Sequence, residues 1–281
     1  MSVIHRRRTL SHGVKRVVQS PTAFSNWPKV LTDMALGSVG RGPESLSFAT
    51  RTGLRIDCPN VPGARVPVYE IFAEDTYRMD WFLGALRDRP IQVIDIGGHV
   101  GTFACRLAQL HPGATIRTFE PSPTTARYLR RNVEQNGLSG RITVFEQALA
   151  AERGFAELDD NGGGSGLNGL VSAGHASAVG TSTRVETVAF DEVVAEGAAP
   201  VDFLKIDCEG GEYDLVYGSS PASWASVHRV VLEYHEVPGQ AWPKLRDWFT
   251  GVGLNVVRHL PSSEYLGAAW LSREPLPALD Q

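Results

Sequence analysis

A glycine-rich turn followed by a distant carboxylate is the strongest chemical signal in the sequence. Residues 93–101 read VIDIGGHVG, an apolar run that ends at Asp95 and leads into three glycines, Gly97, Gly98 and Gly101. Glycine at the end of a strand lets the backbone approach a ligand closely. Glu120 follows nineteen residues after the last of these glycines, and a carboxylate at the end of the next strand accepts hydrogen bonds from both ribose hydroxyls of a nucleoside. Together the two features predict a nucleoside site.

The charge of the turn indicates which nucleoside it binds. A dinucleotide-binding turn has the pattern GxGxxG, and ending that pattern at Gly101 requires glycine at position 96, where this chain has Ile. Asp95 would repel a pyrophosphate but attract a cation. S-Adenosylmethionine carries a sulfonium and an ammonium group and no phosphate. The sequence therefore favours S-adenosylmethionine as the cofactor, and an NAD-dependent oxidoreductase is the more remote alternative.

Acidic residues gather in a second region, residues 201–240, which contain seven acids against two bases. Clustered carboxylates raise one another's pKa, which suits a general base at neutral pH. His235 needs no such help, because the ordinary pKa of histidine is near 6.5. We expect His235 to be the base, with Glu233 or Glu209 orienting it or the substrate. The wider set of candidate bases at strand ends is Asp207, Glu209, Glu212, Glu233 and His235.

The same acids raise the question of a metal ion. Mg²⁺ and Ca²⁺ take oxygen ligands of this kind. The sequence contains no D-x-D loop in this region, so a divalent ion stays an open alternative and no metal site is predicted.

Both groups of residues need strand ends that meet at one edge of a sheet. From residue 91 onward, short apolar runs alternate with helical segments, which indicates a mostly parallel sheet with helices on both faces. The last two strands have a short connection and are expected to be antiparallel. The expected strands are 91–97, 115–120, 142–150, 201–207, 229–235, 254–260 and 265–272, and the expected helices are 101–110, 123–136 and 241–250.

The part before residue 66 is expected to form an N-terminal extension. Apolar positions in 14–36 predict two short helices, because Pro21 and Pro28 interrupt the pattern. Residues 46–56 alternate between apolar and polar and predict a hairpin. A loop is expected over 57–67. Beyond the extension, a helix is expected over 76–87.

The rest of the chain, residues 66–281, is expected to be one catalytic domain. Residues 159–182 do not fit its pattern, because they contain seven glycines. Glycine at that density costs too much entropy for a regular element. The segment is then either a mobile lid or a disordered insertion, and we favour the lid because long loops in compact domains are often functional.

Charge excludes several classes of partner. Residues 1–30 hold six of the 27 basic residues and no acid, which leaves 21 basic and 31 acidic residues elsewhere, a balance of −10. Such a body is a poor general binder of nucleic acid. The basic arm itself is expected to be a helix with a solvated face.

Hydropathy and cysteine content bear on the compartment. No apolar run approaches the roughly 20 residues needed to cross a bilayer. Three scattered cysteines form no CxxC pair, which argues against zinc ligation and a disulfide framework. We expect a cytoplasmic protein that does not associate with membranes.

Four blocks resemble the FkbM family of S-adenosylmethionine-dependent methyltransferases. They read VYEIFAEDTYR (68–78), VIDIGGHVGTFA (93–104), TFEPSP (118–123) and VDFLKIDCEGGEYDLVYG (201–218). The resemblance covers about 170 residues. It implies the class I methyltransferase fold, a Rossmann-like α/β domain with a seven-stranded, mostly parallel sheet and an antiparallel last strand. The chain departs from the usual family pattern at Gly98 and His99, which replace Ala and Asn, and at Gly211, which replaces Ala.

The resemblance also implies roles for individual residues. The three glycines bend round the methionine part of the cofactor, Asp95 orients their turn or reaches the ammonium, and Glu120 takes the ribose. Asp207 faces the sulfonium and the acceptor, and the Tyr77 ring could close over the sulfonium, since aromatic faces attract cations. Gln147 and Ala148 lie where adenine is held. The implied cofactor-binding set is Tyr77, Asp95, Gly97, Gly98, His99, Gly101, Glu120, Pro121, Gln147, Ala148 and Asp207.

The expected function is O-methylation of a small-molecule hydroxyl, such as that of a sugar or a polyketide-like natural product, in secondary metabolism or antibiotic biosynthesis. N-methylation of a small-molecule amine stays open, because an amine acceptor uses the same cofactor site. A binding module that has lost catalysis is disfavoured by the retained glycines and Glu120. A homodimer is possible, and the sequence does not identify the acceptor.

Overall fold

The central sheet of the computed structural model, which describes residues 10–61, 63–160, 169–170, 181–197 and 199–279, has seven strands. Its order is β12-β13-β11-β10-β3-β4-β5. Five neighbouring strands run parallel, and only β13 is antiparallel to its neighbours. The strands are β3 (Ile91–Ile96), β4 (Ala114–Phe119), β5 (Ile142–Phe145), β10 (Phe203–Ile206), β11 (Arg229–Tyr234), β12 (Asn255–Pro261) and β13 (Gly267–Ser272). This is the predicted fold class, with parallel strands whose carboxyl ends meet at one edge.

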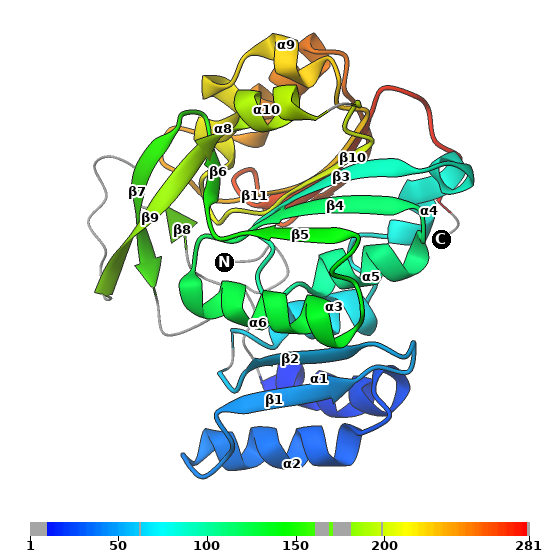
Figure 1. Cartoon of the computed structure of the whole chain (residues 1–281), viewed down its shortest axis with the longest axis vertical. Helices are drawn as coiled ribbons and strands as arrows, with labels where there is room; N and C mark the ends of the chain where they lie inside the picture. The colour runs from blue at the N-terminus through cyan, green and yellow to red at the C-terminus, as the bar shows by residue number, and fades with distance from the viewer. Residues whose placement is uncertain (1–9, 62, 161–168, 171–180, 198, 280–281) are drawn as a thin grey trace.

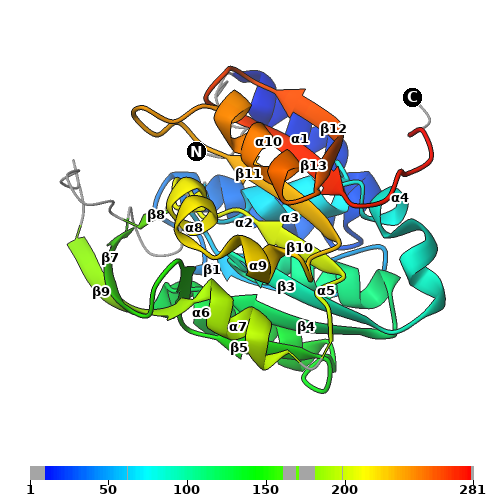
Figure 2. The ribbon, with the colours of Figure 1, turned by 90° about the horizontal axis from the view of Figure 1, so that it is seen from above.

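Helices cover both faces of this sheet, as Figures 1 and 2 show. One face carries α3 (Val66–Phe72), α5 (Thr102–Leu110) and α6 (Pro123–Gln135), and the other carries α7 (Phe190–Glu196), α8 (Glu212–Gly218), α9 (Pro221–Trp224) and α10 (Trp242–Gly251). Successive strand residues point to opposite faces. Val93 and Phe203 therefore pack in one hydrophobic cluster and Ile94 and Leu204 in the other. Both faces of the central strands are buried, which explains their continuous apolar sequences.

The N-terminal extension consists of two helices and a hairpin, α1 (Leu10–Ala23), α2 (Trp27–Ser38), β1 (Ser45–Ala49) and β2 (Arg55–Pro59). Asn132 of α6 holds the hairpin, because its side chain accepts from the Asp57 amide and donates to the Asp57 carbonyl, both at 2.8 Å. Residues of the extension and of the central sheet share one hydrophobic cluster. The N-terminal extension and the catalytic domain, which the sequence divides at residue 65/66, therefore share one hydrophobic core.

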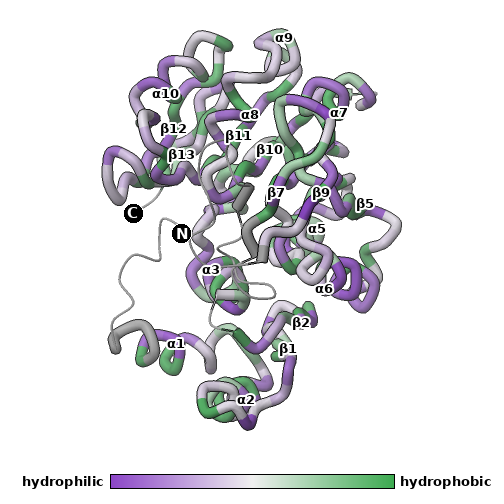
Figure 3. The backbone as a smooth tube through the Cα atoms, turned by 90° about the vertical axis from the view of Figure 1, so that its left-hand side faces the viewer, coloured by the Kyte–Doolittle hydropathy of each residue, from purple (hydrophilic) through white to green (hydrophobic). Residues whose placement is uncertain are grey.

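Helix α1 differs in two ways from what the sequence suggested. It continues through Pro21, where the missing N–H costs one backbone hydrogen bond, and the break falls at residues 24–26. Its basic residues also do not form a purely solvated face, because Arg16 and Lys15 bind Glu74 at 2.5 and 2.9 Å. Figure 3 shows that α1 nevertheless mixes hydrophobic and hydrophilic residues, and Val14 and Val18 are exposed.

The segment 142–150 is two strands rather than one. β5 ends at Phe145, and β6 (Ala148–Ala150) joins a second sheet of order β6-β9-β7-β8. The polar pair Glu146 and Gln147 makes the turn between them. The other strands of this sheet are β7 (Gly154–Asp160), β8 (Gly169–Leu170) and β9 (Thr181–Ala189).

The predicted lid falls largely outside the described residues. The strands β7 and β9 pair as far as Asp160 and Thr181, so both ends of the segment 159–182 belong to regular structure. Residues 161–168 and 171–180 of the lid lie outside the described part of the chain.

The segment before the first sheet strand is less helical than expected. Over 76–87 the structure has a short helix, α4 (Met79–Leu83), followed by a 3₁₀ turn, η1 (Gly84–Asp88). Gly84 adopts a positive φ as the cap of α4, which ends the α-helix there. Among the described residues, none of the helices has the length and apolar character to span a bilayer.

Gly97 is the point at which two strand ends come closest, and this predicts a sharp effect of substitution. A Cβ there would lie 1.8 Å from the carbonyl oxygen of Asp207, and φ is +76°. Gly137 has a similar φ of +66° but open space around it. We expect Gly137→Ala to lower the free energy of unfolding by about 1–2 kcal/mol and Gly97→Ala by about 3 kcal/mol or more, because overpacking adds to the backbone cost.

Urea unfolding of both variants measures the difference. Equal losses for Gly97→Ala and Gly137→Ala would contradict the close approach of the two strand ends.

Candidate cofactor and acceptor site

A buried lysine lies at the junction of β3 and β10. The Lys205 ammonium donates to the carbonyls of Ile96 and Gly97, at 3.1 and 2.9 Å. It also lies 3.3 Å from an oxygen of Asp95 and 3.6 Å from an oxygen of Asp207. Burial would lower the pKa of Lys205, but the two carboxylates outweigh it and raise the pKa to about 12. Lys205 is therefore a permanent cation between the first and fourth parallel strands along the chain.

Asp95 lies directly before the glycine turn, and its roles in orienting the turn or reaching the cofactor's ammonium stay predictions. It is fully buried in β3, where Thr118 of the neighbouring strand donates to it at 2.9 Å. Burial raises its pKa, and Lys205 opposes that rise. The contacts of its carboxylate are therefore with Thr118 and Lys205 of the protein itself.

The glycine turn leaves the end of β3 with a left-handed backbone. The amides of Gly97 and Gly98 both donate to the Phe119 carbonyl at 3.0 Å, which ties the turn to β4. His99 has a φ of +49°, and Gly101, with φ +83°, caps the start of α5. A non-glycine residue in the left-handed region stores strain, so His99 is held there by the contacts of its neighbours.

Glu120 connects this turn to the next helix. One carboxylate oxygen accepts from the His99 amide at 2.8 Å and the other from the Ser122 amide at 2.9 Å. Each oxygen keeps a further lone pair for a ribose hydroxyl. Burial raises the pKa of Glu120 to about 7, against the effect of the two amides. Pro121 lies between Glu120 and Ser122, the residue that caps α6.

The residues predicted to hold adenine lie one strand further along the edge. Gln147 is in the turn after β5, and Ala148 begins β6. The Glu120 amide donates to the Phe145 carbonyl at 3.0 Å, which joins the end of β5 to the residue predicted to bind the ribose. A role in binding adenine stays a prediction for both residues.

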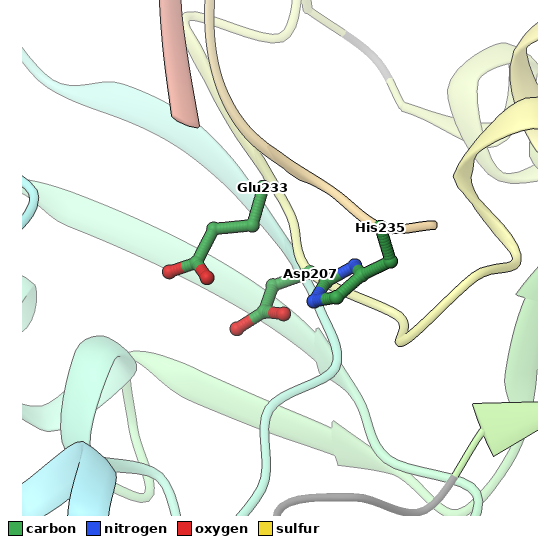
Figure 4. Close-up of side chains that lie close together, drawn as sticks. All are labelled: Asp207, Glu233 and His235. Atoms are coloured by element: carbon green, nitrogen blue, oxygen red, sulfur yellow. The ribbon is translucent and has the colours of Figure 1, made fainter. Parts of the chain in front are cut away.

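A second cluster, which contains the candidate bases, joins Tyr77 to the ends of β10 and β11. The Tyr77 hydroxyl donates to Glu233 at 2.8 Å and lies 3.2 Å from Asp207. Burial, with Asp207 and Glu233 nearby, raises the pKa of Tyr77 well above its ordinary value, so the hydroxyl keeps its proton. Figure 4 shows Asp207, Glu233 and His235 with their polar ends close together. The prediction that the Tyr77 ring covers the sulfonium stays a prediction.

His235 lies between two acids, Glu212, which was not expected to orient it, and Glu209, which was. Its Nδ1 lies 2.6 Å from Glu212, and its Nε2 lies 3.4 Å from Glu209. Burial would lower the pKa of His235, but Glu212 and Glu209 outweigh it and raise the pKa to about 10. The expectation that His235 keeps a pKa near 6.5 and is ready to accept a proton at neutral pH is therefore wrong. Glu233, which was expected to orient it, is instead bound to Tyr77.

The remaining carboxylates differ in charge state and access. Burial would raise the pKa of Asp207, but Lys205 and His235 outweigh it and lower the pKa below its ordinary value. Burial raises the pKa of Glu209 and, with help from Asp207 and Glu70, raises that of Glu233 to about 8. The Asp207 side chain is 22% exposed, against 12% for Glu209 and 4% for Lys205. Asp207 is thus the ionised carboxylate that an incoming molecule reaches most easily.

Two residues that shape the site were not given their roles from sequence. Lys205 is one of two bases in an acidic region, and its place inside the apolar run FLKI is the signal of a buried, paired charge. Glu212 was one of several candidate bases. It binds His235 and also accepts from the amides of Cys208 and Gly210, at 3.3 and 3.0 Å.

The ionisation of Glu120 predicts a pH-dependent affinity for the cofactor product. Its raised pKa of about 7 means that at lower pH the carboxylate must lose a proton before both oxygens accept from the ribose. The affinity for S-adenosylhomocysteine is therefore expected to fall below pH 7, towards a limit of about tenfold per pH unit. Calorimetry between pH 5.5 and 8 in matched buffers measures it.

The matched control is Glu120→Gln, which is expected to bind more weakly at every pH and with a flat profile. A wild-type profile as flat as that of Glu120→Gln would refute the assignment of Glu120.

Removal of the buried ammonium predicts a large loss of stability. Lys205→Met leaves Asp95 and Asp207 without their cation and is expected to cost about 3–5 kcal/mol in the free energy of unfolding. Exposed Lys29, 68% accessible and paired with Asp33, is the control, and Lys29→Met is expected to cost less than about 1 kcal/mol. Adding Asp95→Asn to Lys205→Met is expected to recover part of the loss. Similar costs for the two lysines in urea unfolding would count against the central ion cluster.

Comparison with known proteins identifies the family. Residues 95–255, more than half of the chain, match the Methyltransferase FkbM domain. The matched range runs from Asp95 past His235, so it includes most of the site described above. The match is to a methyltransferase family and gives no support to the NAD-dependent alternative.

Two named relatives are similar over part of their length. The chain is 29% identical over 172 residues to the 31-O-demethyl-FK506 methyltransferase FkbM of Streptomyces tacrolimicus, covering 52% of this chain and 66% of that protein. It is 31% identical over 148 residues to the 2-O-methyltransferase NoeI of Sinorhizobium fredii, covering 48% of this chain and 60% of that protein. The aligned region thus spans less than two thirds of either relative.

A solved structure shows the same fold. The METTL16 MTase domain aligns with a TM-score of 0.50 at 14% identity, over 96% of both chains. The seven-stranded sheet and its order agree with the class I methyltransferase fold expected from the sequence. The family match confirms S-adenosylmethionine as the cofactor. The chain belongs to the methyltransferase FkbM domain family.

Proposed function

We propose that this methyltransferase transfers the methyl group of S-adenosylmethionine to a hydroxyl of a small molecule, such as a sugar or a polyketide-like natural product. The observation that carries the proposal is the Tyr77–Asp207–Glu233 cluster next to the cofactor turn. A hydroxyl must lose its proton when it is methylated, and this cluster supplies carboxylates beside the predicted position of the sulfonium. The names of the two relatives, a 31-O-demethyl-FK506 methyltransferase and a 2-O-methyltransferase, agree with an oxygen acceptor.

The reaction is an in-line displacement at a carbon that the sulfonium already activates. The acceptor oxygen forms a bond to the methyl carbon while the bond from carbon to sulfur breaks, and the electron pair of that bond stays on sulfur. The products are the methyl ether and S-adenosylhomocysteine. The hydroxyl proton passes to a carboxylate of the cluster and then to solvent. Alignment of the two reacting atoms is the protein's largest contribution, with general base catalysis second.

The residues divide this work by position and charge. Asp207 is ionised and the most exposed of the cluster, so it accepts the hydrogen bond from the acceptor hydroxyl and orients it. Tyr77 holds Asp207 and Glu233 in register through its hydroxyl. Lys205 fixes Asp207 from the side away from the acceptor. His235 is an imidazolium at neutral pH, so it contributes positive charge and does not act as the base.

The first test is methyl transfer from isotopically labelled S-adenosylmethionine to a panel of monosaccharides and macrolactone polyols, with amines of matching size alongside. We expect labelled methyl ethers among the products. If the labelled methyl group is transferred to the amines alone, the protein is an N-methyltransferase and the proposal of O-methylation is wrong. If calorimetry detects no binding of S-adenosylhomocysteine, the proposed methyl transfer is refuted.

The second test locates the catalytic carboxylate. Asp207→Asn is expected to lower kcat by about 10²–10⁴-fold while leaving S-adenosylhomocysteine affinity within a few fold, because the ribose is held elsewhere. Asp214→Asn is the matched control, since Asp214 is an exposed acid nearby on α8. An Asp207→Asn enzyme as fast as Asp214→Asn would contradict the role of Asp207.

A further inference from the structure

Three side chains at the ends of β10 and β11 are arranged as ligands of a single ion. Asp207, Glu233 and His235 each offer one ligand atom, and these atoms lie within 4.8 Å of one another. Figure 4 shows the two carboxylates and the imidazole converging from two adjacent strand ends. Glu233 and His235 are two positions apart at the end of β11, so their side chains leave the same face of the strand. Such a convergence brings one nitrogen and two oxygen donors to one point.

Two of these donor groups have atoms with unused hydrogen-bonding capacity. Within the described residues, Asp207 Oδ1 and His235 Nε2 are buried and have no hydrogen-bond partner. His235 is only 4% exposed, so solvent does not readily satisfy its Nε2. A buried polar atom without a partner costs free energy. The nearest acid to Nε2, Glu209 at 3.4 Å, makes no hydrogen bond with it.

The other nitrogen of His235, Nδ1, is held by Glu212. Glu212 lies 2.6 Å from Nδ1 and is itself fully buried and anchored by the amides of Cys208 and Gly210. Histidine ligands of metal ions usually donate their second nitrogen to a carboxylate in this way, which sets the tautomer and directs the free nitrogen at the ion. The Glu212–His235 pair thus directs Nε2 at this point, where a metal ion would take the place of the proton that Nε2 carries in the ion's absence.

The charge of the surroundings also favours a cation. Four carboxyl groups surround this point, those of Asp207, Glu209, Glu212 and Glu233. Their cationic partners are Lys205, which Asp95 and two carbonyls share, and His235 while it keeps its proton. Buried like charges require compensation. Tyr77 compensates only in part, because its hydroxyl is a neutral donor to Glu233.

We propose that Asp207, Glu233 and His235 bind one divalent metal ion, with Glu212 as the carboxylate that orients His235. The two carboxylates suit Mn²⁺ and the imidazole suits Zn²⁺, so this mixed donor set fits either of these ions better than Ca²⁺, which takes oxygen ligands. Three protein ligands leave coordination positions open. The site lies at the strand ends beside the cofactor turn, so an open position faces the region assigned to the acceptor.

The proposal deepens the proposed function and rests on it only for the use of the ion. A cation at this point would bind the acceptor oxygen and stabilise its negative charge. Binding of the ion itself depends on the three ligands and not on any methyl transfer. The two proposals therefore fail separately: methyl transfer is tested by product analysis, and the ion site by spectroscopy on the protein without substrate.

The experiment uses the full chain, treated with EDTA, desalted and titrated with Mn²⁺ while free Mn²⁺ is followed by electron paramagnetic resonance. We expect one bound Mn²⁺ per chain and, in electron spin echo measurements, a nitrogen coupling from a directly bound imidazole. This coupling is read from the wild-type protein, so it does not depend on any variant folding. The absence of saturable binding of Mn²⁺, and of Zn²⁺ in competition, up to about 1 mM would overturn the proposal.

Variants locate the bound ion. Glu233→Gln and His235→Gln are each expected to weaken Mn²⁺ binding at least tenfold, and Glu212→Gln by about 10–100-fold as an orienting residue. Asp202→Asn is the matched control: Asp202 is a buried acid just before β10, at the opposite end of that strand, where it binds Arg89 at 2.5 Å, and its replacement is expected to leave affinity unchanged. Binding without nitrogen coupling, or with equal affinity in Glu233→Gln and Asp202→Asn, places the ion elsewhere and overturns the site.

Discussion

The structure depends on one buried ammonium group. Lys205 lies in a central strand, and its Nζ joins the carbonyls at the end of β3 to the carboxylates of Asp95 and Asp207. A buried charge is stable only when it is paired and hydrogen-bonded. The same contacts that stabilise Lys205 therefore hold together the glycine turn on one side and Asp207 on the other. The part of the site predicted to bind the cofactor and the part proposed to bind the acceptor therefore meet at the Lys205 ammonium.

The two halves are built by different means. The cofactor half is mainly backbone: amides of the turn bind the Phe119 carbonyl, and the amides of His99 and Ser122 fix Glu120. The acceptor half consists of side chains from separate segments, with Tyr77 reaching Asp207 and Glu233 across more than 100 residues of sequence. Backbone geometry suits a cofactor of constant shape, whereas side chains allow the acceptor to differ between relatives of one fold.

Much of the fold was predictable because local patterns decide it. The buried parallel strands appear in the sequence as short apolar runs. Gly97 and Glu120 follow the ends of two of these strands, and those positions indicate a nucleoside site. The pKa of His235 was not predictable, because it depends on Glu212 and Glu209, and sequence order does not state which acid lies against which nitrogen. The division of 142–150 between two sheets was missed for a similar reason, since β6 pairs with β9, more than 30 residues away.

A crystal structure with bound S-adenosylhomocysteine tests the central claim most directly, because it locates both halves of the site in one observation. With the cofactor product bound, the two ribose hydroxyls should bind the Glu120 carboxylate, and the sulfur should lie on the side of the turn that faces Asp207 and Glu233. A nucleoside bound away from Glu120, or a sulfur directed away from Asp207, would contradict the proposal that the two halves meet at the Lys205 ion cluster.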